Sequence, residues 1–535
     1  MARPKRSQLI AVGIAALFIA AACGPAPAGP AASPAGSAAA QLAAVQELVV
    51  ATTADGYRND EKRTTIGMYP LNANIFDTLV TLSPDYQVLP GLATKWEFRA
   101  PNTYRFTLRS GVKFHDGTPF TSKDVVWSLQ RIAKQGGGTV GVSDKSAVAV
   151  DDMTVDVTPK AANLRSLQQL VHMTWSIAKA ESETAKPMGT GPFKFVEYVK
   201  DQRIVVASND EYWGGKPTLR KITFRFIPDA NTRVLALQAG EVQISDIPKE
   251  SAKTLTGGDF TVNRSKVGAY EALYINVRGK EGYDLGKDVA IRQAIAYGID
   301  KKTVVESVWQ GNAEVSQTMI PAGILGAEAS RITGTNRDVA KAKKLLDDAG
   351  WKPGADGIRE KGGRKLSMTM VVGFPNADVH KPMPEFAQAQ FKEIGIDAKI
   401  VITPDTASYE ARLAKGEGDI WVEAGSQNDA NPCFLPDLLF SSPVPGGDEE
   451  SNMYGNSFAL GTSFDAAIKR CREATATADV QKAAADAMKL LVDDQFVVVP
   501  LAGTFRINGI SKKVMDFVVH PAGLHQRWET VKLAK

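Results

Sequence analysis

Cysteine is nearly absent from this sequence of 535 residues, which contains only Cys23, Cys433 and Cys471. No CxxC pair occurs, and neither Cys433 nor Cys471 lies near a histidine in a pattern typical of a nucleophile. These absences exclude the common zinc and dithiol motifs. In an exported protein Cys433 and Cys471 could form one disulfide, or they could remain two buried thiols, because connectivity cannot be inferred from sequence.

Histidine is also scarce, with five residues in the chain. His172, His380, His520 and His525 are scattered, and no HxH or HExxH spacing occurs. The sequence therefore predicts no metal site, although a pair of histidines could still meet in the folded chain.

The fifth histidine lies in FHDGTPF (residues 114–120), where His115 stands directly beside Asp116. The pair could be a general base with its orienting carboxylate, but Asp-Gly is a turn signal and no nucleophile is near. The TSKD that follows fits a capping box, with Thr121 accepting from a helix N–H and Asp124 reaching back. We interpret the stretch as a turn and a helix start, and we predict no catalytic residue and no cofactor.

Net charge is small, with 63 Lys and Arg against 59 Asp and Glu, and the basic residues form no long run. Nucleic-acid binding therefore has little electrostatic support. Glycine-rich segments lack the Lys-Ser/Thr of a phosphate-binding loop, so no ATPase activity is expected.

Long apolar runs are absent except at the N-terminus. MARPKRSQ is a basic segment, and the apolar run at 9–22 has the length of a signal-peptide core and is short for a membrane span. Ala20-Ala21-Ala22-Cys23-Gly24 resembles the lipobox of bacterial lipoproteins, in which the cysteine is acylated; an ordinary secretory cleavage site is the alternative. We expect a lipoprotein signal peptide at 1–22, lipidation of Cys23, and a flexible Pro/Ala/Gly/Ser tether at 23–46.

From Glu47 onward, strand-like segments with short apolar or alternating runs are followed in turn by segments with helical periodicity, as in mixed α/β domains. Alternation puts Tyr104, Phe106 and Leu108 on one face of a half-buried strand. The clearest predicted strands are 47–53, 103–109, 221–227, 272–277, 365–372, 397–403 and 496–502. The clearest predicted helices are 122–132, 289–299, 341–350, 386–395 and 480–495.

Five segments occur in a characteristic order: PGLATKW (90–96), FHDG (114–117), GTGPFKFVEY (189–198), the run 209–246, and RQA-x-x-x-x-ID (292–300). Together they resemble the extracytoplasmic solute-binding proteins of ABC importers, in the family that binds peptides, nickel complexes and related solutes (family 5). The resemblance extends from about residue 47 to the end of the chain.

The resemblance implies an α/β, two-lobe fold of the periplasmic-binding-protein type (cluster C), with an extra subdomain inserted in lobe one. The ligand would be enclosed between the lobes, and the strands at 272–277 and 496–502 would suit a hinge. By analogy the parts are 47–75, 200–280 and 500–535 for lobe one, 76–199 for the inserted subdomain, and 281–499 for lobe two.

The segment 419–442 carries the most specific expectation about a ligand. In peptide-binding relatives an aspartate three residues before an acidic residue and a proline pairs with the α-amino group of the ligand. Here Pro432 follows Asn431, so the corresponding position is Asn428, an amide, with Asp429 next to it. An amide at this position suits a neutral or hydroxyl-rich solute; otherwise Asp429 would pair with a cationic group of the ligand. A polar loop with Asn-Pro turn chemistry is the alternative.

Aromatic residues would supply the walls of such a cleft. Trp421 is the first candidate, followed by Tyr69 and Asn72, with Trp175 after them. Each of these aromatic residues would also suit a core position.

The resemblance implies capture of a small solute, by default a peptide, outside the cytoplasmic membrane and its delivery to an ABC permease by a monomeric, lipid-anchored, periplasmic or surface protein. Oligosaccharides, opine-like conjugates and metal chelates are alternative solutes. A sensory lipoprotein is an alternative role, and a surface hydrolase would require a nucleophile–base pair that the sequence does not show.

Overall fold

The computed structural model describes residues 41–53, 72–101, 103–134, 143–158, 170–181, 187–255, 257–373, 382–443, 449–474 and 476–535. Cys23, Tyr69 and His380 lie outside these ranges, so the expectations for Cys23 and Tyr69 remain predictions. The chain divides into Met1–Gln41 and one compact unit, Leu42–Lys535. Among the helices that the structure describes, none has the length and apolar character needed to cross a bilayer.

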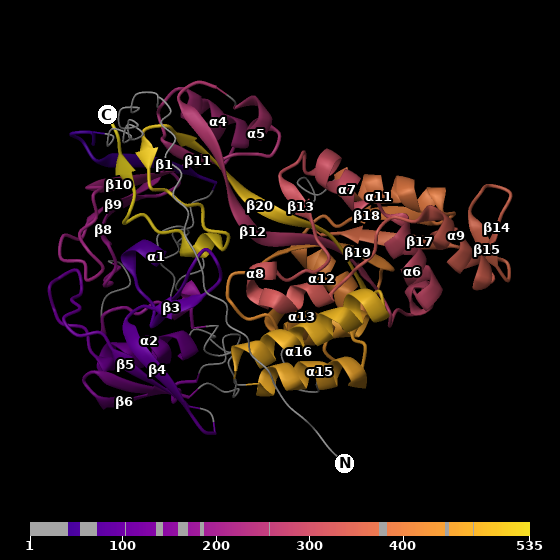
Figure 1. Cartoon of the computed structure of the whole chain (residues 1–535), viewed down its shortest axis with the longest axis horizontal. Helices are drawn as coiled ribbons and strands as arrows, with labels where there is room; N and C mark the ends of the chain where they lie inside the picture. The colour runs from indigo at the N-terminus through magenta and orange to yellow at the C-terminus, as the bar shows by residue number, and fades with distance from the viewer. Residues whose placement is uncertain are drawn as a thin grey trace, which may run out of the picture. The chain divides into compact units, whose positions relative to one another are not determined.

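One large sheet organises the unit Leu42–Lys535 (Figure 1). Its strands follow the order β18-β17-β19-β12-β20-β11-β1-β10-β9-β8, with β13 beside β20. The strands are β1 (Glu47–Thr52), β8 (Phe193–Val199), β9 (Arg203–Ser208), β10 (Lys221–Phe226), β11 (Ile244–Asp246), β12 (Phe260–Ile275), β13 (Ala313–Val315), β17 (Ser367–Val372), β18 (Asp397–Ile402), β19 (Ile420–Ser426) and β20 (Val498–Ser511).

Strands β12 and β20 join the two ends of this sheet. They pair antiparallel along most of their length; the C-terminal half of β12 also pairs with β19, and the C-terminal part of β20 pairs with β11 (Figure 1). The β12–β20 register shifts between Arg264 and Val267, between Val267 and Ala269, and between Glu271 and Ala272. Such irregularities bend a strand and increase its twist, so the pair changes direction near its middle.

Smaller sheets surround the large one. A four-stranded sheet has the order β4-β5-β7-β6, and helix α2 packs against β6 and β7. The strands of the small sheets are β4 (Ala93–Arg99), β5 (Thr103–Leu108), β6 (Ala147–Asp151), β7 (Thr154–Val157), β2 (Val80–Leu82), β3 (Val88–Pro90), β14 (Lys352–Pro353), β15 (Arg359–Lys361), β16 (Arg364–Lys365), β21 (Val514–Met515) and β22 (Lys532–Leu533).

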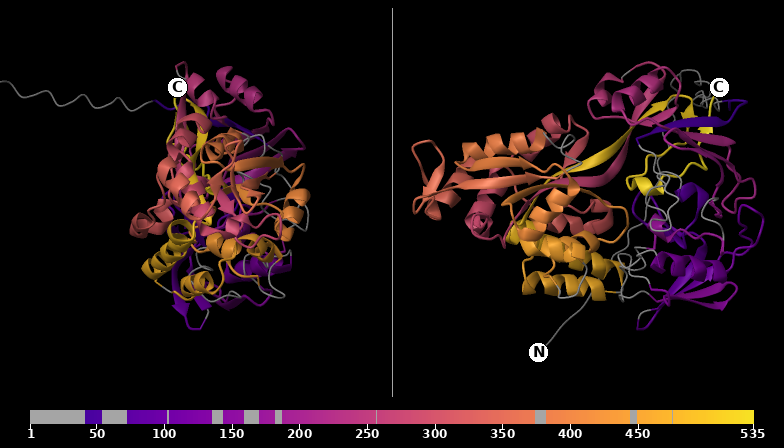
Figure 2. Two further views of the ribbon diagram at one scale, coloured as in Figure 1. Left: turned by 90° about the vertical axis from the view of Figure 1, so that its right-hand side faces the viewer. Right: turned by 180° about the vertical axis from the view of Figure 1, so that it is seen from behind.

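Helices cover both faces of the β18-β17-β19-β12 part of the sheet (Figures 1 and 2). Alternate strand residues point to opposite faces. Leu273, Met370 and Ile420 pack with α6, α9 and α11, whereas Tyr274, Val371 and Trp421 pack with α12 to α16. The helices are α1 (Asn72–Ile75), α2 (Ser122–Lys134), α4 (Ala230–Gln238), α5 (Ser251–Thr254), α6 (Val289–Gly298), α7 (Lys301–Thr303), α8 (Ala322–Leu325), α9 (Val339–Asp348), α11 (Pro382–Glu393), α12 (Thr406–Lys415), α13 (Phe434–Phe440), α14 (Glu449–Phe458), α15 (Thr462–Glu473) and α16 (Thr477–Lys489).

Single helical turns occur at several connections. Those at Val304–Val308 and Leu490–Asp494 are π-helical, so the predicted helix 480–495 ends in a wider turn. The others are η2 (Met173–Trp175), η3 (Leu285–Lys287), η5 (Gly326–Arg331) and η7 (Gly523–His525).

The FHDG stretch is a turn that docks on the GTGP segment. The His115 Nε2 lies 3.1 Å from the Gly191 carbonyl oxygen, and Lys194 donates to the His115 carbonyl oxygen at 2.8 Å. Burial lowers the pKa of His115 to about 4. Asp116 is paired with Lys179 instead. His115 and Asp116 thus bond separately to other groups, as expected of a structural turn.

The helix start after this turn differs in one detail from the sequence-based expectation. The Thr121 N–H donates to Asp124 Oδ2 at 2.9 Å, as the capping box requires. The Thr121 hydroxyl, however, also donates to that carboxylate, at 3.2 Å. The Asp124 N–H, which a capping box would direct to this hydroxyl, donates to the Thr121 carbonyl oxygen at 3.1 Å, so this part of the expectation was wrong.

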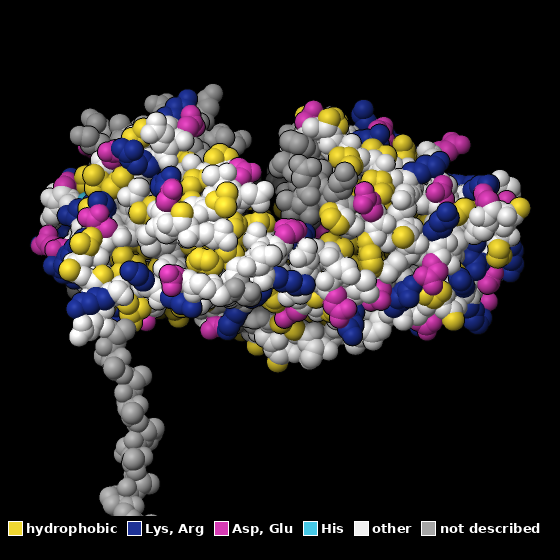
Figure 3. Space-filling model, turned by 90° about the horizontal axis from the view of Figure 1, so that it is seen from above, with side chains coloured by type: hydrophobic (Ala, Val, Ile, Leu, Met, Phe, Trp, Pro, Cys, Tyr) yellow, Lys and Arg dark blue, Asp and Glu magenta, His cyan; other side chains and the backbone are white. Residues whose placement is uncertain are grey.

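Acidic and basic side chains are interspersed on the face shown in Figure 3. This face has no large area of one sign, in line with the near balance of 63 basic and 59 acidic residues.

Candidate functional site

The loop after β19 is held by its own amide and carboxylate groups. Asp429, 6% exposed, accepts at Oδ1 from Gln427 Nε2 at 2.7 Å and from the Asn431 N–H at 2.9 Å. Asn431 accepts at Oδ1 from the Cys433 N–H at 3.0 Å. These local side-chain-to-backbone bonds are the Asx turns typical of Asp and Asn, and they fix the loop without a regular element.

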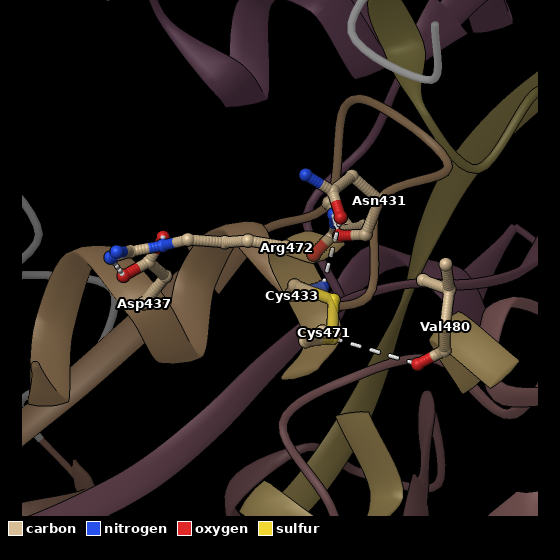
Figure 4. The surroundings of a disulfide bond; sticks show 7 residues. Asn431, Cys433, Asp437, Cys471, Arg472 and Val480 are labelled. Atoms are coloured by element: carbon tan, nitrogen blue, oxygen red, sulfur yellow. Dashed lines mark hydrogen bonds and ion pairs between the residues drawn. A yellow bond between two sulfur atoms is a disulfide. The ribbon is translucent and has the colours of Figure 1, made fainter. Parts of the chain in front are cut away.

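A disulfide secures the end of this loop (Figure 4). Cys433, just before α13, is bonded to Cys471 in α15, with Cα atoms 6.2 Å apart. The two alternatives left by the sequence are thereby decided in favour of the pair. One turn further on, Arg472 Nε donates to Asp437 Oδ2 at 2.8 Å, so an ion pair lies beside the covalent link.

Asn428, a partly buried residue of the fixed loop, has one unused acceptor. Its main-chain oxygen accepts from His525 Nε2 at 3.0 Å. Its side-chain Oδ1 is buried and has no hydrogen-bond partner in the structure. Because a buried carbonyl oxygen without a partner costs about 1–3 kcal/mol, this atom is a place where a ligand N–H or O–H would be stabilising.

Two of the scattered histidines meet beside Asn428. The rings of His520 and His525 lie 5.4 Å apart. His520 Nε2 is 3.2 Å from the Leu82 carbonyl oxygen, and its Nδ1 accepts from the Ala522 N–H at 3.1 Å. Burial lowers the pKa of His520 to about 4. Burial, together with the neighbouring His520, also holds the pKa of His525 well below its usual range, so both rings are neutral at pH 7.

His525 was not among the residues proposed from the sequence. No spacing signal could have found it, because its partner Asn428 is 97 residues away. In the part of the chain that the structure describes, no group of three or more His, Cys, Asp or Glu side chains is arranged to hold a metal ion.

Asn72 and Trp175 belong to segments that converge on the same place. Asn72 begins α1, which contacts η7, the turn that carries His525. Ala73, Met173 and Leu524 form a small apolar cluster that joins α1, η2 and η7. The structure therefore brings the segments of Asn72, Trp175 and Asn428 together around η7.

Trp175 and Trp421 are both deeply buried. Trp175 is 2% exposed and Trp421 is fully buried, and the indole N–H of each has no partner. Trp421 packs edge-on against Tyr409, with ring centroids 5.2 Å apart. Both tryptophans therefore occupy core positions, which the sequence left open as the alternative to a cleft position. Contact of either indole with a ligand remains a prediction.

A cavity of about 290 Å³ lies where β12, β20 and β13 meet the segment before α8. Val267, Ala269 and Gly503 line it from the middle of the long strand pair, and Tyr270 forms part of its wall. Gln317, also in the wall, accepts at Oε1 from Lys301 Nζ at 2.7 Å. Burial lowers the pKa of Lys301 to about 8.

The turn between β2 and β3 reaches the long strands near this cavity. Tyr86 donates its hydroxyl to the Val267 carbonyl oxygen at 3.3 Å, and Asp85 forms an ion pair with Lys266. Burial raises the pKa of Tyr86 above its usual value, and the charge of Asp429 adds to the increase. The cavity, this turn and the Asn428 loop are therefore neighbours.

The comparisons with known proteins agree with this architecture. The family model of the bacterial extracellular solute-binding proteins, family 5, matches residues 87–446. The chain is 29% identical over 477 residues to the dipeptide-binding protein of Escherichia coli K12, an alignment that covers 82% of this chain and 85% of that protein. The chain therefore belongs to the family 5 extracellular solute-binding proteins, as its five motifs indicated.

Solved structures show the same fold. NikA from Brucella suis, in complex with Fe(III)-EDTA, superposes with a TM-score of 0.78 at 24% identity, covering 91% of this chain and 99% of that one. DppA from Helicobacter pylori, in complex with the peptide STSA, superposes with a TM-score of 0.68 at 25% identity, covering 91% and 98%. The predicted α/β, two-lobe fold is thereby confirmed.

Proposed function

We propose that this protein binds a small solute of the peptide class outside the cytoplasmic membrane and delivers it to an ABC permease. Family membership supports the binding role, and relatives include a dipeptide-binding protein and a structure with a bound tetrapeptide. The observation that carries the proposal is the buried, unpartnered Oδ1 of Asn428 in a loop fixed by Asp429 and the disulfide.

An amide acceptor at this position changes what the site selects. Asn428 Oδ1 could accept a hydrogen bond from an N–H group of a peptide N-terminus, and the buried carbonyl oxygen would then regain a partner. The bond is weaker than one to a carboxylate, since only the donor is charged. The site would therefore discriminate less strongly for a free amino group than an aspartate would.

Delivery requires that occupancy change the conformation. We assign 47–75, 200–280 and 500–535 to lobe one, 76–199 to its inserted subdomain and 281–499 to lobe two. With these bounds β20 passes from lobe two into lobe one at residue 500, and β12 of lobe one pairs with β19 of lobe two. The irregular middle of the β12–β20 pair suits a hinge. A ligand that contacts both lobes favours the closed form, which the permease would recognise. Acylation of Cys23 would keep the protein at the membrane.

Native mass spectrometry of the protein as purified tests the solute class. The expected result is a retained mass that corresponds to one or more short peptides and is released by denaturation. A retained oligosaccharide, opine-like conjugate or metal chelate would replace peptides as the solute.

Calorimetry with Asn428→Ala tests the site. Removal of the acceptor should weaken binding of the retained solute by about ten- to a hundredfold, because a hydrogen bond to a charged donor contributes about 1.5–3 kcal/mol. Asn456→Ala is the matched control, since Asn456 is an exposed residue of α14 whose side chain donates to the Ala414 carbonyl oxygen at 3.4 Å. Equal affinities of the two variants would remove Asn428 from the site.

A further inference from the structure

Glu423 is a second buried acceptor group, and neither the function just proposed nor the fold makes use of it. It lies in the middle of β19, two residues from Trp421 and two from Gly425. Residues that alternate along a strand share a face, so all three point toward the side covered by α12 to α16. Its residue surface is partly exposed, yet its Oε1 is sequestered from solvent and has no hydrogen-bond partner.

Tyrosines from the neighbouring strand surround this carboxyl group. Ala272 of β12 pairs directly with Glu423, and Tyr274 and Tyr270 pair with Trp421 and Gly425, the next residues on the same face of β19. Directly paired residues of antiparallel strands point to the same face. The two tyrosine hydroxyls are 2.7 Å apart, so the rings lean toward each other across Ala272.

Gly425 makes this arrangement possible. A Cβ at Gly425 would lie 2.7 Å from the Tyr270 hydroxyl, so any side chain there would displace the ring. Tyr270 also lines the 290 Å³ cavity, and the Tyr274 hydroxyl lies 4.0 Å from the sulfur of Met319, another residue of the cavity wall. Glu423 itself does not line the cavity, but it interacts electrostatically with both tyrosines, and these connect its carboxyl group to the cavity wall.

No described cation compensates Glu423. No Lys or Arg forms an ion pair or a hydrogen bond with it within the described ranges, and burial alone raises the pKa of Glu423 to about 8. Among the described residues, Tyr270 and Tyr274 of β12 interact electrostatically with Glu423, and the helices that cover this face carry Tyr409 of α12, Tyr454 of α14 and the Asp437–Arg472 ion pair of α13 and α15. An unpaired buried carboxyl group costs several kcal/mol when it is ionised, and its protonated form still leaves an acceptor unsatisfied.

We propose that Glu423, with Tyr270 and Tyr274, forms a subsite that selects a cationic group of the solute, an ammonium or a guanidinium. Carboxylate pairing would neutralise the cation, and aromatic faces stabilise cations by a further cation–π attraction. The subsite rests on the proposed solute-binding function and specifies its substrate class. Asn428 follows Glu423 by five residues, a span of about 17 Å at most along extended chain, which a short peptide can bridge.

A measurable consequence is the release of a proton. With a pKa of about 8, Glu423 is mostly protonated at pH 7 in the empty protein. A bound ammonium group pairs with the carboxylate form, so the proton leaves for the buffer as the cation binds. Affinity for a cationic solute should therefore rise as the pH increases from 6 to 8, while affinity for a neutral solute should not.

The test compares the tripeptides Ala-Lys-Ala and Ala-Gln-Ala, together with agmatine as a non-peptide cation, by calorimetry in buffers of different ionisation enthalpy. The full chain is expected to bind Ala-Lys-Ala at least tenfold more tightly than Ala-Gln-Ala and to release close to one proton at pH 6.5. Glu423→Gln should abolish both the preference and the proton release. Glu410→Gln, an exposed position on α12, should change neither.

The outcomes separate this inference from the proposed function. If Ala-Gln-Ala binds as tightly as Ala-Lys-Ala, or if the preference survives in Glu423→Gln, the subsite is refuted and peptide binding stands. If agmatine binds in a Glu423-dependent manner and no tripeptide binds, the subsite stands and the peptide class fails. If none of the three ligands binds, both fail. If Glu423→Gln does not fold, the protein without substitutions still tests the subsite: binding of Ala-Lys-Ala without proton release at pH 6.5 would refute it.

Discussion

Breaking the Cys433–Cys471 disulfide should destabilise the protein by an amount that the loop length predicts. The bond closes a loop with a sequence separation of 38 residues. Loop-closure entropy for this length corresponds to about 4 kcal/mol at 25 °C, because the reduced unfolded chain regains the freedom that the link removed. Cys433→Ala/Cys471→Ala, in a Cys23→Ser background, should therefore lose about 4 kcal/mol of unfolding free energy.

The melting temperature then reports which part of the chain unfolds with the disulfide. Unfolding entropy is about 2 cal/mol/K per residue near the transition. If Leu42–Lys535 unfolds as one unit, the loss lowers the melting temperature by about 4 °C; if the proposed lobe two, 281–499, unfolds alone, the decrease is about 9 °C. Scanning calorimetry separates these cases.

Two controls make the disulfide prediction strict. The non-reduced Cys23→Ser protein should show no free thiol after denaturation, and reduction of that protein should reproduce the melting temperature of the double alanine variant. If the double alanine variant melted within about 1 °C of the oxidised protein, the reasoning would be refuted. The disulfide would then not restrict the freedom of the unfolded chain enough to affect stability.

Two further predictions concern buried charge. Arg527 donates to Asp77 Oδ1 at 3.2 Å and to Glu529 at 2.7 Å; although burial opposes its charge, Tyr212, Glu529 and Asp77 raise the pKa of Arg527. Arg527→Met should cost about 3 kcal/mol or more in urea unfolding because Asp77 stays buried without its cation, whereas Arg99→Met, an exposed pair with Glu97, should change the unfolding free energy by less than about 0.5 kcal/mol. Burial lowers the pKa values of His115, His172 and His520 to about 4, so the unfolded chain binds more protons below pH 6.5 and unfolding free energy should fall as the pH drops from 6.5 to 4. His115→Gln should flatten part of that slope, and an unchanged slope would contradict the assigned burial effect.

Local pattern was sufficient for many elements. The alternation that placed Tyr104, Phe106 and Leu108 on one face corresponds to β5, where the three side chains are 2%, 0% and 4% exposed. Helix α6 and strand β18 begin and end within a few residues of their predicted bounds. These elements could be predicted because each buries one face, and burial of one face imposes a period on the sequence.

The long strands were predicted only in part. The apolar run 272–277 indicated a strand, but β12 begins at Phe260, and β20 extends to Ser511 beyond the predicted end at 502. The additional residues, FTVNRSKVGAYE and GTFRINGIS, include many polar residues and no continuous apolar run. They are strand because β12 and β20 pair with each other, which is a tertiary cause.

The sequence by itself determined the period of each buried element and, through its ordered motifs, the family. The tertiary structure decided which distant groups meet: Cys433 with Cys471, His525 with Asn428, and Glu423 with the tyrosines of β12. A period records only whether a side chain is buried, whereas a site depends on which other segments bury it. For that reason Glu423, an unremarked acid within a predicted strand, became a candidate for selectivity only when its neighbours were known.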